Sequence, residues 1–111
     1  WRLISFQVNC GTNIAPQAKI ELKSKGKIRS GCSTGDGPVD ACYKAIEKVI
    51  GIKTRLLDYH IDAVTSGEDA LGEVSVRIES RGRAVVGRSA STDIIEASVK
   101  AYLGAINKII I

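Results

Sequence analysis

The side chains best suited to chemistry are seven carboxylates near the expected helix starts and loops: Asp36, Asp40, Glu68, Asp69, Glu73, Asp93 and Glu96. Paired carboxylates can exchange protons with a substrate or hold a metal ion. Acidic residues near a helix N-terminus also complement the positive end of the helix dipole, and this interpretation fits their positions better. His60 is the only histidine, and its distance in sequence from the three cysteines does not indicate a zinc site. We therefore expect no catalytic residue, no metal ion and no cofactor.

The cysteines Cys10, Cys32 and Cys42 form no C-x-x-C motif. Their odd number favours small buried thiols in the reducing cytoplasm over disulfides. The sequence has no run of about 18 apolar residues and no signal peptide, so we expect a cytoplasmic protein without a membrane partner. Because it begins at Trp1 and contains no Met, we expect it to be a piece of a larger protein.

The formal net charge of +4 suggests a nucleic-acid partner as one interpretation. Most of the basic residues lie on the polar phase of expected strands or at hairpin tips, where solvated strand faces explain them. No aromatic residues alternate with them, as stacking on bases would need. We therefore expect no nucleic-acid partner; a basic nucleic-acid module, whose affinity would fall steeply with salt, stays an alternative.

The segments 35–41 and 90–96 have the composition of helix starts. The free backbone N–H groups of such a start can bind a carboxylate or a phosphate. Neither segment is a Walker A loop, since no Gly-Lys-Ser/Thr follows. Two such starts beside an apolar strand face would suit a small amphiphilic ligand such as an amino acid.

These segments belong to a sequence that repeats itself at an offset of 56 residues. Residues 25–27 (Lys-Gly-Lys) match residues 81–83 (Arg-Gly-Arg), and residues 40–45 match residues 96–101. Two copies predict one pseudo-symmetric domain rather than an open solenoid, with a seam where a ligand or a partner could bind. We expect an α+β fold in which two β-β-β-α units, residues 1–52 and 53–111, form one compact domain.

Hydrophobic periodicity places the elements of each unit. Pro38 is suited to the first turn of a helix and Gly51 to its end, and Asp93 with Glu96 is a plausible capping box. Gly26 and Gly82 are expected at the hairpin tips. The expected strands are 3–9, 18–23, 27–33, 56–64, 74–78 and 84–88, with loop 66–69 and helices after Gly37 and Ser91.

The first strands break the repeat. Ile4, Phe6 and Val8 are the apolar phase in the first copy, whereas Leu57, Tyr59, Ile61 and Ala63 are the apolar phase in the second, on the opposite parity at offset 56. Side chains alternate between the faces of a strand, so a slip of one residue reverses them. Either the alignment slips by one here, or the two copies bury different faces and residues 57–63 line something particular to the second.

Four segments together resemble a known family: 35–41 (Gly-Asp-Gly-Pro-Val-Asp-Ala), 57–59 (Leu-Asp-Tyr), 65–74 (Thr-Ser-Gly-Glu-Asp-Ala-Leu-Gly-Glu-Val) and 91–98 (Ser-Thr-Asp-Ile-Ile-Glu-Ala-Ser). The chain resembles, nearly end to end, the C-terminal regulatory domain of 2-isopropylmalate synthase, shared in outline with citramalate synthase. The resemblance implies a homodimer that binds L-leucine and so inhibits a metal-dependent catalytic barrel of the same polypeptide. The chain itself would not be an enzyme, because that barrel, which condenses acetyl-CoA with 2-oxoisovalerate, is missing from it.

The resemblance also implies the effector site: Gly37, Val39, Asp40, Leu56, Tyr59, Ala63, Ala70, Ala90 and Thr92. In the physical interpretation, backbone N–H groups at a helix start bind the effector carboxylate, and Asp40 or Asp69 binds its ammonium group. Val39, Leu56, Tyr59, Ala63 and Ala70 would enclose the aliphatic tail. Without the resemblance, Tyr59 would be interpreted as a core aromatic with its hydroxyl at the rim, and Ala63 and Ala70 as ordinary packing.

Three other functions stay open besides the nucleic-acid module. An isoleucine-binding domain of citramalate synthase differs only in the position of one methyl group in the effector, worth ~1–3 kcal/mol. A dimerisation module that binds no ligand is a second alternative. An enzyme in its own right is the least favoured.

Overall fold

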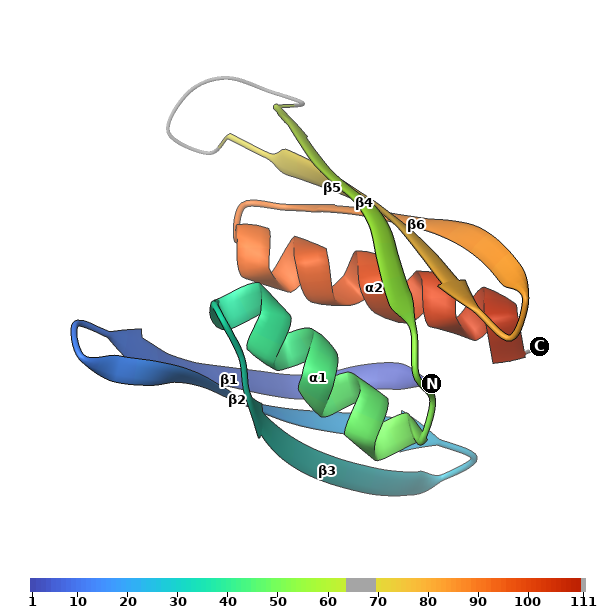
Figure 1. Cartoon of the computed structure of the whole chain (residues 1–111), viewed down its shortest axis with the longest axis horizontal. Helices are drawn as coiled ribbons and strands as arrows, with labels where there is room; N and C mark the ends of the chain where they lie inside the picture. The colour runs from blue at the N-terminus through green and yellow to red at the C-terminus, as the bar shows by residue number, and fades with distance from the viewer. Residues whose placement is uncertain (64–69, 111) are drawn as a thin grey trace. The chain divides into compact units, whose positions relative to one another are not determined.

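The computed structural model describes residues 1–63 and 70–110 and confirms an α+β fold of two β-β-β-α units (Figure 1). The units comprise Trp1–Lys53 and Thr54–Ile111, a boundary one residue from the expected one. That they make a single domain over residues 1–111 stays a prediction. The elements are β1 (Arg2–Gly11), β2 (Ile14–Ser24), β3 (Lys27–Thr34) and α1 (Pro38–Ile50), then β4 (Arg55–Ala63), β5 (Gly72–Ser80), β6 (Arg83–Ser91) and α2 (Ile94–Ile110).

Each unit is an antiparallel sheet in sequence order, β1-β2-β3 or β4-β5-β6, with one helix packed on one face. The tight turns β2–β3 and β5–β6 have positive φ at both central residues, 51° and 78° at Lys25 and Gly26, and 54° and 73° at Arg81 and Gly82. Two positive φ angles are what a type I′ hairpin turn requires. Glycine adopts them freely, whereas Lys25 and Arg81 are basic residues in a conformation that non-glycine residues rarely occupy.

The core of each unit lies between the middle strand and its helix. Alternate residues of β2 and of β5 are buried because side chains on a strand alternate between its faces. On the helices, buried residues recur with the helical period that the sequence predicts. The fully buried large side chains are Ile20, Leu22, Cys42 and Ile46 in the first unit, and Val74, Val76, Ile78, Val99, Tyr102 and Ile106 in the second.

A glycine brings each helix close to its edge strand. A Cβ atom at Gly31 of β3 would lie 2.8 Å from Val49 Cγ2 and 3.5 Å from the Ala45 carbonyl oxygen of α1. A Cβ atom at Gly87 of β6 would collide with the Ala101 carbonyl oxygen of α2 and lie 2.8 Å from the Ala105 nitrogen. Both contacts recur at offset 56, so the repeat preserves a helix–strand distance that leaves little or no room for a side chain.

The helix ends follow the expected signals. Pro38 is the first residue of α1, and Gly51 ends it at φ 78°, donating its N–H to the Glu47 carbonyl oxygen at 2.8 Å. The expected capping box at α2 is half formed. Asp93 Oδ1 accepts the N–H groups of Ile95 at 2.9 Å and Glu96 at 3.4 Å, whereas the Asp93 N–H donates to Ser91 Oγ.

The first strands turn the same face to their helices in both copies. Phe6 is paired with Ile20 and Tyr59 with Val76, so β1 and β4 correspond at an offset of 53, while β2 and β5 keep 56. The alignment of the first strands therefore slips by three residues, which exchanges the faces of the strand just as the expected slip of one residue would. The alternative expectation, that the two copies bury different faces, is wrong. The extra residues fall between Ala63 and Gly72. Val64, Gly67 and the expected loop 66–69 lie outside the described residues.

The expectation of three buried thiols is wrong for two of them. Cys42 is buried in α1, and burial raises the pKa of its thiol to about 11. Cys10 and Cys32 are exposed. Cys32 lies opposite Lys19 in the β2–β3 pairing, on the face of the sheet away from α1, and Cys10 lies within the irregularity between Asn9 and Gly11 of β1.

Gly87→Ala should destabilise the second unit by about 1–3 kcal/mol, because the new methyl group must push α2 away from β6. Gly104→Ala is the matched control. Gly104 lies within α2 with no atom within 4 Å of an added Cβ, so this change should stabilise by about 0.5–1 kcal/mol. Urea unfolding measures both. Equal effects of the two changes would contradict the close helix–strand approach.

Candidate effector-binding site

The start of α1 is open. Gly37 precedes the helix in an extended conformation, and no side chain caps the first turn. A Cβ atom at Gly37 would meet nothing within 4 Å, so space is available beside the backbone there. Pro38 has no N–H, which leaves the N–H groups of Val39 and Asp40 to point out of the first turn. An uncapped helix N-terminus of this kind can bind a carboxylate.

The start of α2 is closed by comparison. The Asp93 carboxylate accepts hydrogen bonds from the N–H groups of Ile95 and Glu96. These two groups correspond to the N–H groups of Val39 and Asp40 in α1. Ser91 Oγ lies 3.5 Å from Glu96 Oε1 and closes the turn further. Of the two helix starts expected to bind an anion, only that of α1 is left without an internal carboxylate on these groups.

Asp40 is half-buried in the first turn of α1 and holds the preceding loop. Its Oδ2 atom accepts the Asp36 N–H at 2.9 Å and pairs with Lys44 Nζ at 3.0 Å. The backbone hydrogen bond from Asp36 lowers the pKa of Asp40; burial opposes this, and Lys44 adds to it. Asp40 is therefore an anion at neutral pH. It has a further oxygen atom with which to accept a bond from an ammonium group.

Tyr59 is tied to α2. Its hydroxyl lies 2.6 Å from Ser98 Oγ, and Ser98 Oγ donates to the Ile94 carbonyl oxygen at 2.7 Å, so Tyr59 donates to Ser98. The ring is half-buried on the helix side of β4. This placement agrees with a core aromatic that has its hydroxyl at the rim. The partner was missed in the sequence, although a serine within the apolar stripe of the expected helix was a signal for it.

The remaining expected site residues all belong to the second unit. Leu56, Tyr59 and Ala63 share the helix side of β4, with Leu56 47 % exposed. Ala63 is paired with Gly72. The Ile94 side chain lies so close to Gly72 that a Cβ atom on this glycine would collide with that side chain. Ala90 is exposed and is paired with Glu73 on the opposite face of the sheet. Ala70 and Thr92 are exposed outside the strands, and Asp69 lies outside the described residues.

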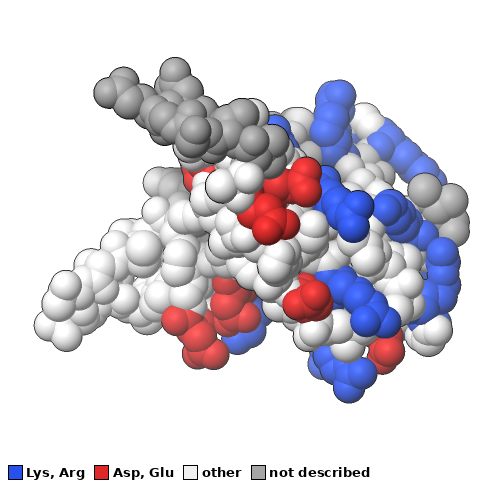
Figure 2. Space-filling model, turned by 90° about the horizontal axis from the view of Figure 1, so that it is seen from above, with Lys and Arg blue, Asp and Glu red and all other residues white. Residues whose placement is uncertain are grey.

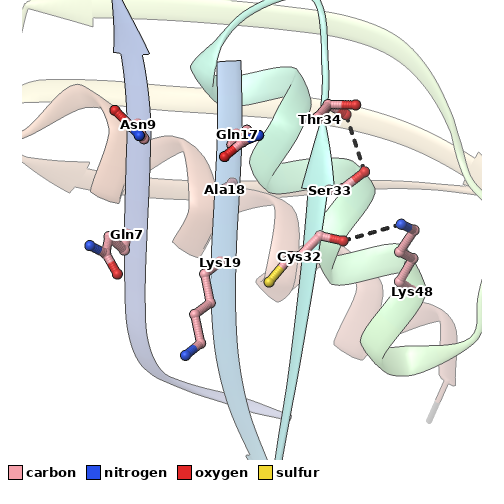
Figure 3. Close-up of a pocket in the computed structure, with 9 residues that line it drawn as sticks. All are labelled: Gln7, Asn9, Gln17, Ala18, Lys19, Cys32, Ser33, Thr34 and Lys48. Atoms are coloured by element: carbon pink, nitrogen blue, oxygen red, sulfur yellow. Dashed lines mark hydrogen bonds between the residues drawn. The ribbon is translucent and has the colours of Figure 1, made fainter. Parts of the chain in front are cut away.

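A hollow of about 530 Å³ lies on the first unit, and none of the expected residues lines it. Figure 3 shows Gln7 and Asn9 on β1, Gln17 and Lys19 on β2, and Cys32 on β3. At its edge, Lys48 of α1 donates to the Cys32 carbonyl oxygen at 3.1 Å. The amide groups can donate and accept hydrogen bonds, but no carboxylate lines the hollow. In the sequence, the only signal for this hollow is the polar phase of the first two strands.

Residues 1–63 and 70–110 contain no group of three or more His, Cys, Asp or Glu side chains placed to hold a metal ion. Among the same residues, neither helix is long and apolar enough to cross a membrane.

The chain belongs to the LeuA allosteric (dimerisation) domain family, whose pattern matches residues 1–110. It is similar to 2-isopropylmalate synthases: 52 % identical to that of Carboxydothermus hydrogenoformans over 95 % of the chain, 52 % to that of Heliobacterium modesticaldum over 95 %, and 47 % to that of Aquifex aeolicus over 99 %. The chain spans about a fifth of the length of these relatives, which it matches over 20–21 % of their residues. The resemblance found in the sequence is thus confirmed at the level of the family.

Asp40→Asn should lower the melting temperature at pH 7, because an amide cannot replace the anion that holds Asp36 and Lys44. A carboxylate with a lowered pKa stabilises the fold above its ordinary value of 3.8, and loses this effect as the pH falls through the lowered pKa. The difference in melting temperature between the two proteins should therefore shrink toward zero in acid. A difference that stays constant between neutral and strongly acid pH would contradict this role.

Proposed function

We propose that the chain is the regulatory domain of a 2-isopropylmalate synthase, which binds L-leucine for feedback inhibition and dimerises. The observation that carries the proposal is the match of nearly the whole chain to the allosteric family and to synthases five times its length. Catalysis would then belong to another part of the same polypeptide, and the chain itself would be no enzyme. Its three free cysteines are compatible with work in the reducing cytoplasm.

We propose the following roles for the effector residues. The N–H groups of Val39 and Asp40 at the open start of α1, beside Gly37, are proposed to bind the leucine carboxylate. Asp40, or Asp69, binds its ammonium group through a charge-assisted hydrogen bond. Val39, Leu56, Tyr59, Ala63 and Ala70 contact the aliphatic tail. Ala90 and Thr92 complete the proposed set.

Isoleucine is the main alternative effector, as in a citramalate synthase domain. The relatives reported above favour leucine, because each bears the name 2-isopropylmalate synthase. A dimerisation module that binds no amino acid is the second alternative. Both alternatives are outcomes of the same titration.

L-leucine at millimolar concentration should raise the melting temperature, because a ligand that binds only the folded state stabilises it by mass action. Valine should raise it less, since its side chain buries one methylene fewer, worth ~0.8 kcal/mol. Differential scanning fluorimetry measures both. A larger shift with isoleucine than with leucine would move the assignment to citramalate synthase, and no shift with any of the three would leave a dimerisation module.

Gly37→Asp should weaken leucine binding by about ten- to a hundredfold, because the new carboxylate would cap α1 as Asp93 caps α2. Loss of hydrogen bonds to a charged group costs about 1.5–3 kcal/mol, which corresponds to this change in affinity. The melting temperature without leucine should not fall. Gly37→Ala is the control: it adds no cap in an extended backbone, and it should bind leucine nearly as well as wild type. Wild-type affinity in a capped, stabilised Gly37→Asp protein would place the carboxylate elsewhere.

The proposed homodimer is supported by apolar surface on the helix side of β4. Because α2 packs on β5 and β6, Leu56 and Ile61 are each left 47 % exposed. A second copy would cover them. Sedimentation at tens of micromolar should therefore show a dimer, and Ile61→Asp should shift it to monomer. Ile28→Asp, at a residue 56 % exposed on the other face of the first sheet, should leave the dimer intact. A wild-type monomer would contradict the proposal, and dissociation only by the second change would move the interface to the first sheet.

A further inference from the structure

The positive charge of the chain is concentrated in its first unit. Residues 1–53 contain nine Lys and Arg against four Asp and Glu, a net charge of +5, whereas residues 54–111 contain seven against eight, a net charge of −1. Figure 2 shows Lys and Arg side chains in blue and Asp and Glu side chains in red on one face of the molecule. Since both units have the same fold, the fold alone does not require this difference.

The two copies differ most sharply at the paired positions near the hairpin end. Arg55 of β4 lies opposite Glu79 of β5, and the two form an ion pair at 3.5 Å. The corresponding residues of the first unit, at offsets of 53 and 56, are Arg2 and Lys23, which lie directly opposite each other on β1 and β2. Like charges at directly opposite positions of an antiparallel pair are destabilising. The first unit thus holds two cations where the second holds a cation and an anion.

A third cation lies beside this pair. Lys25 occupies the left-handed region at the hairpin tip, with φ 51°, and lines with Arg2 and Lys23 an open hollow of about 330 Å³. Trp1, Ser24 and Gly26 complete its lining, which contains no acidic residue. In the second unit the corresponding residue is Arg81, a cation with φ 54°, but there the neighbouring strand pair already contains the Glu79 carboxylate.

The cationic hollow is bounded. The next pair on this face of β1 and β2 is Ser5 and Glu21, whose hydroxyl and carboxylate are hydrogen-bonded at 2.8 Å. Lys27 and Arg29 are paired with Ser24 and Leu22 and so belong to the helix side of the sheet, away from Lys23. The three cations therefore form a compact cluster rather than a basic stripe along the surface.

We propose that this hollow, lined by Arg2, Lys23 and Lys25, binds a small multivalent anion of the polyphosphate class. Guanidinium and ammonium groups form charge-assisted hydrogen bonds with phosphate oxygens. The bound anion offsets the repulsion between Arg2 and Lys23. In the second unit, the carboxylate of Glu79 supplies the negative charge beside Arg55. Leucine, a zwitterion with a single carboxylate, does not meet this need, and none of the expected effector residues lines the hollow.

Lys23→Glu tests the proposal directly, because it installs in the first unit the ion pair that the second already has. Inorganic triphosphate, titrated calorimetrically at low ionic strength, should bind wild type and bind Lys23→Glu at least tenfold more weakly. Without triphosphate, the melting temperature of Lys23→Glu should be equal to or above that of wild type. Lys25→Gly relieves the left-handed backbone at the tip, so it should also stay folded and should weaken binding several-fold.

Arg88→Glu is the matched control, since it makes the same change in net charge at an exposed residue of β6 and should change binding less than twofold. An equal loss in Arg88→Glu and Lys23→Glu would overturn the site in favour of general charge attraction. So would absence of triphosphate binding at millimolar concentration, or a single-stranded oligonucleotide that binds more tightly per phosphate than triphosphate. ATP distinguishes the source of the phosphates: tighter binding than triphosphate indicates a nucleotide with its base against Trp1, and equal binding indicates phosphate alone.

Discussion

The distance between helix and sheet is the constraint on which each unit depends. At Gly31 and at Gly87 the backbone of the helix approaches the edge strand so closely that a methyl group would contact or collide with it. At Gly87 the close contact is with the backbone of α2, so a bulkier residue there would force the helix away; at Gly31 it is with the Val49 side chain of α1. These contacts place the first turn of each helix. The packing of buried aliphatic residues from β2 or β5 against the helix then stabilises an arrangement whose geometry the glycines have set.

The two units share this fold but differ at the helix start and at the hairpin end. At each place the second unit has a carboxylate that the first unit lacks. At the helix start, the second unit supplies Asp93 as a cap, while the first presents Gly37 and leaves the backbone open. At the hairpin end, the second unit pairs Arg55 with Glu79, while the first sets Arg2 against Lys23. Comparison with the second unit therefore shows which groups of the first unit lack a partner inside the fold. The groups that lack such a partner in the first unit are the ones that we propose bind ligands.

Much of the fold could be predicted because its signals are local. Turn glycines, Pro38, Gly51 and the alternating residues of β2 each determine the structure within a few residues. The size of the slip between the first strands could not be predicted from the sequence. A slip of one residue and a slip of three residues both exchange the two faces of the strand. Pairing partners decide between them, and these lie far away in the sequence. The exposure of Cys32 was missed for a related reason, since it depends on which face of the strand the helix covers, whereas Cys10 lies at an irregularity in the pairing of β1.

The expected site was predictable only in its residue types. Asp40 was expected to serve an effector, and the structure shows that it also holds Asp36 and Lys44, a role visible only in three dimensions. The bond from Tyr59 to Ser98 links residues 39 apart, and the sequence offered only a polar residue in an apolar stripe as a hint. The difference between the two helix starts could be read from Gly37 and Asp93, but its meaning required knowing which N–H groups each cap occupies.

Amide chemical-shift mapping during a titration with L-leucine tests the central claim most directly, because it reports on both helix starts within one molecule. The account predicts that the amides of Val39 and Asp40 shift with leucine and saturate together with those of Tyr59 and Ala63. It predicts that the amides of Ile95 and Glu96, already bonded to Asp93, shift much less. Equal shifts at both helix starts, or shifts at Ile95 and Glu96 alone, would contradict the account.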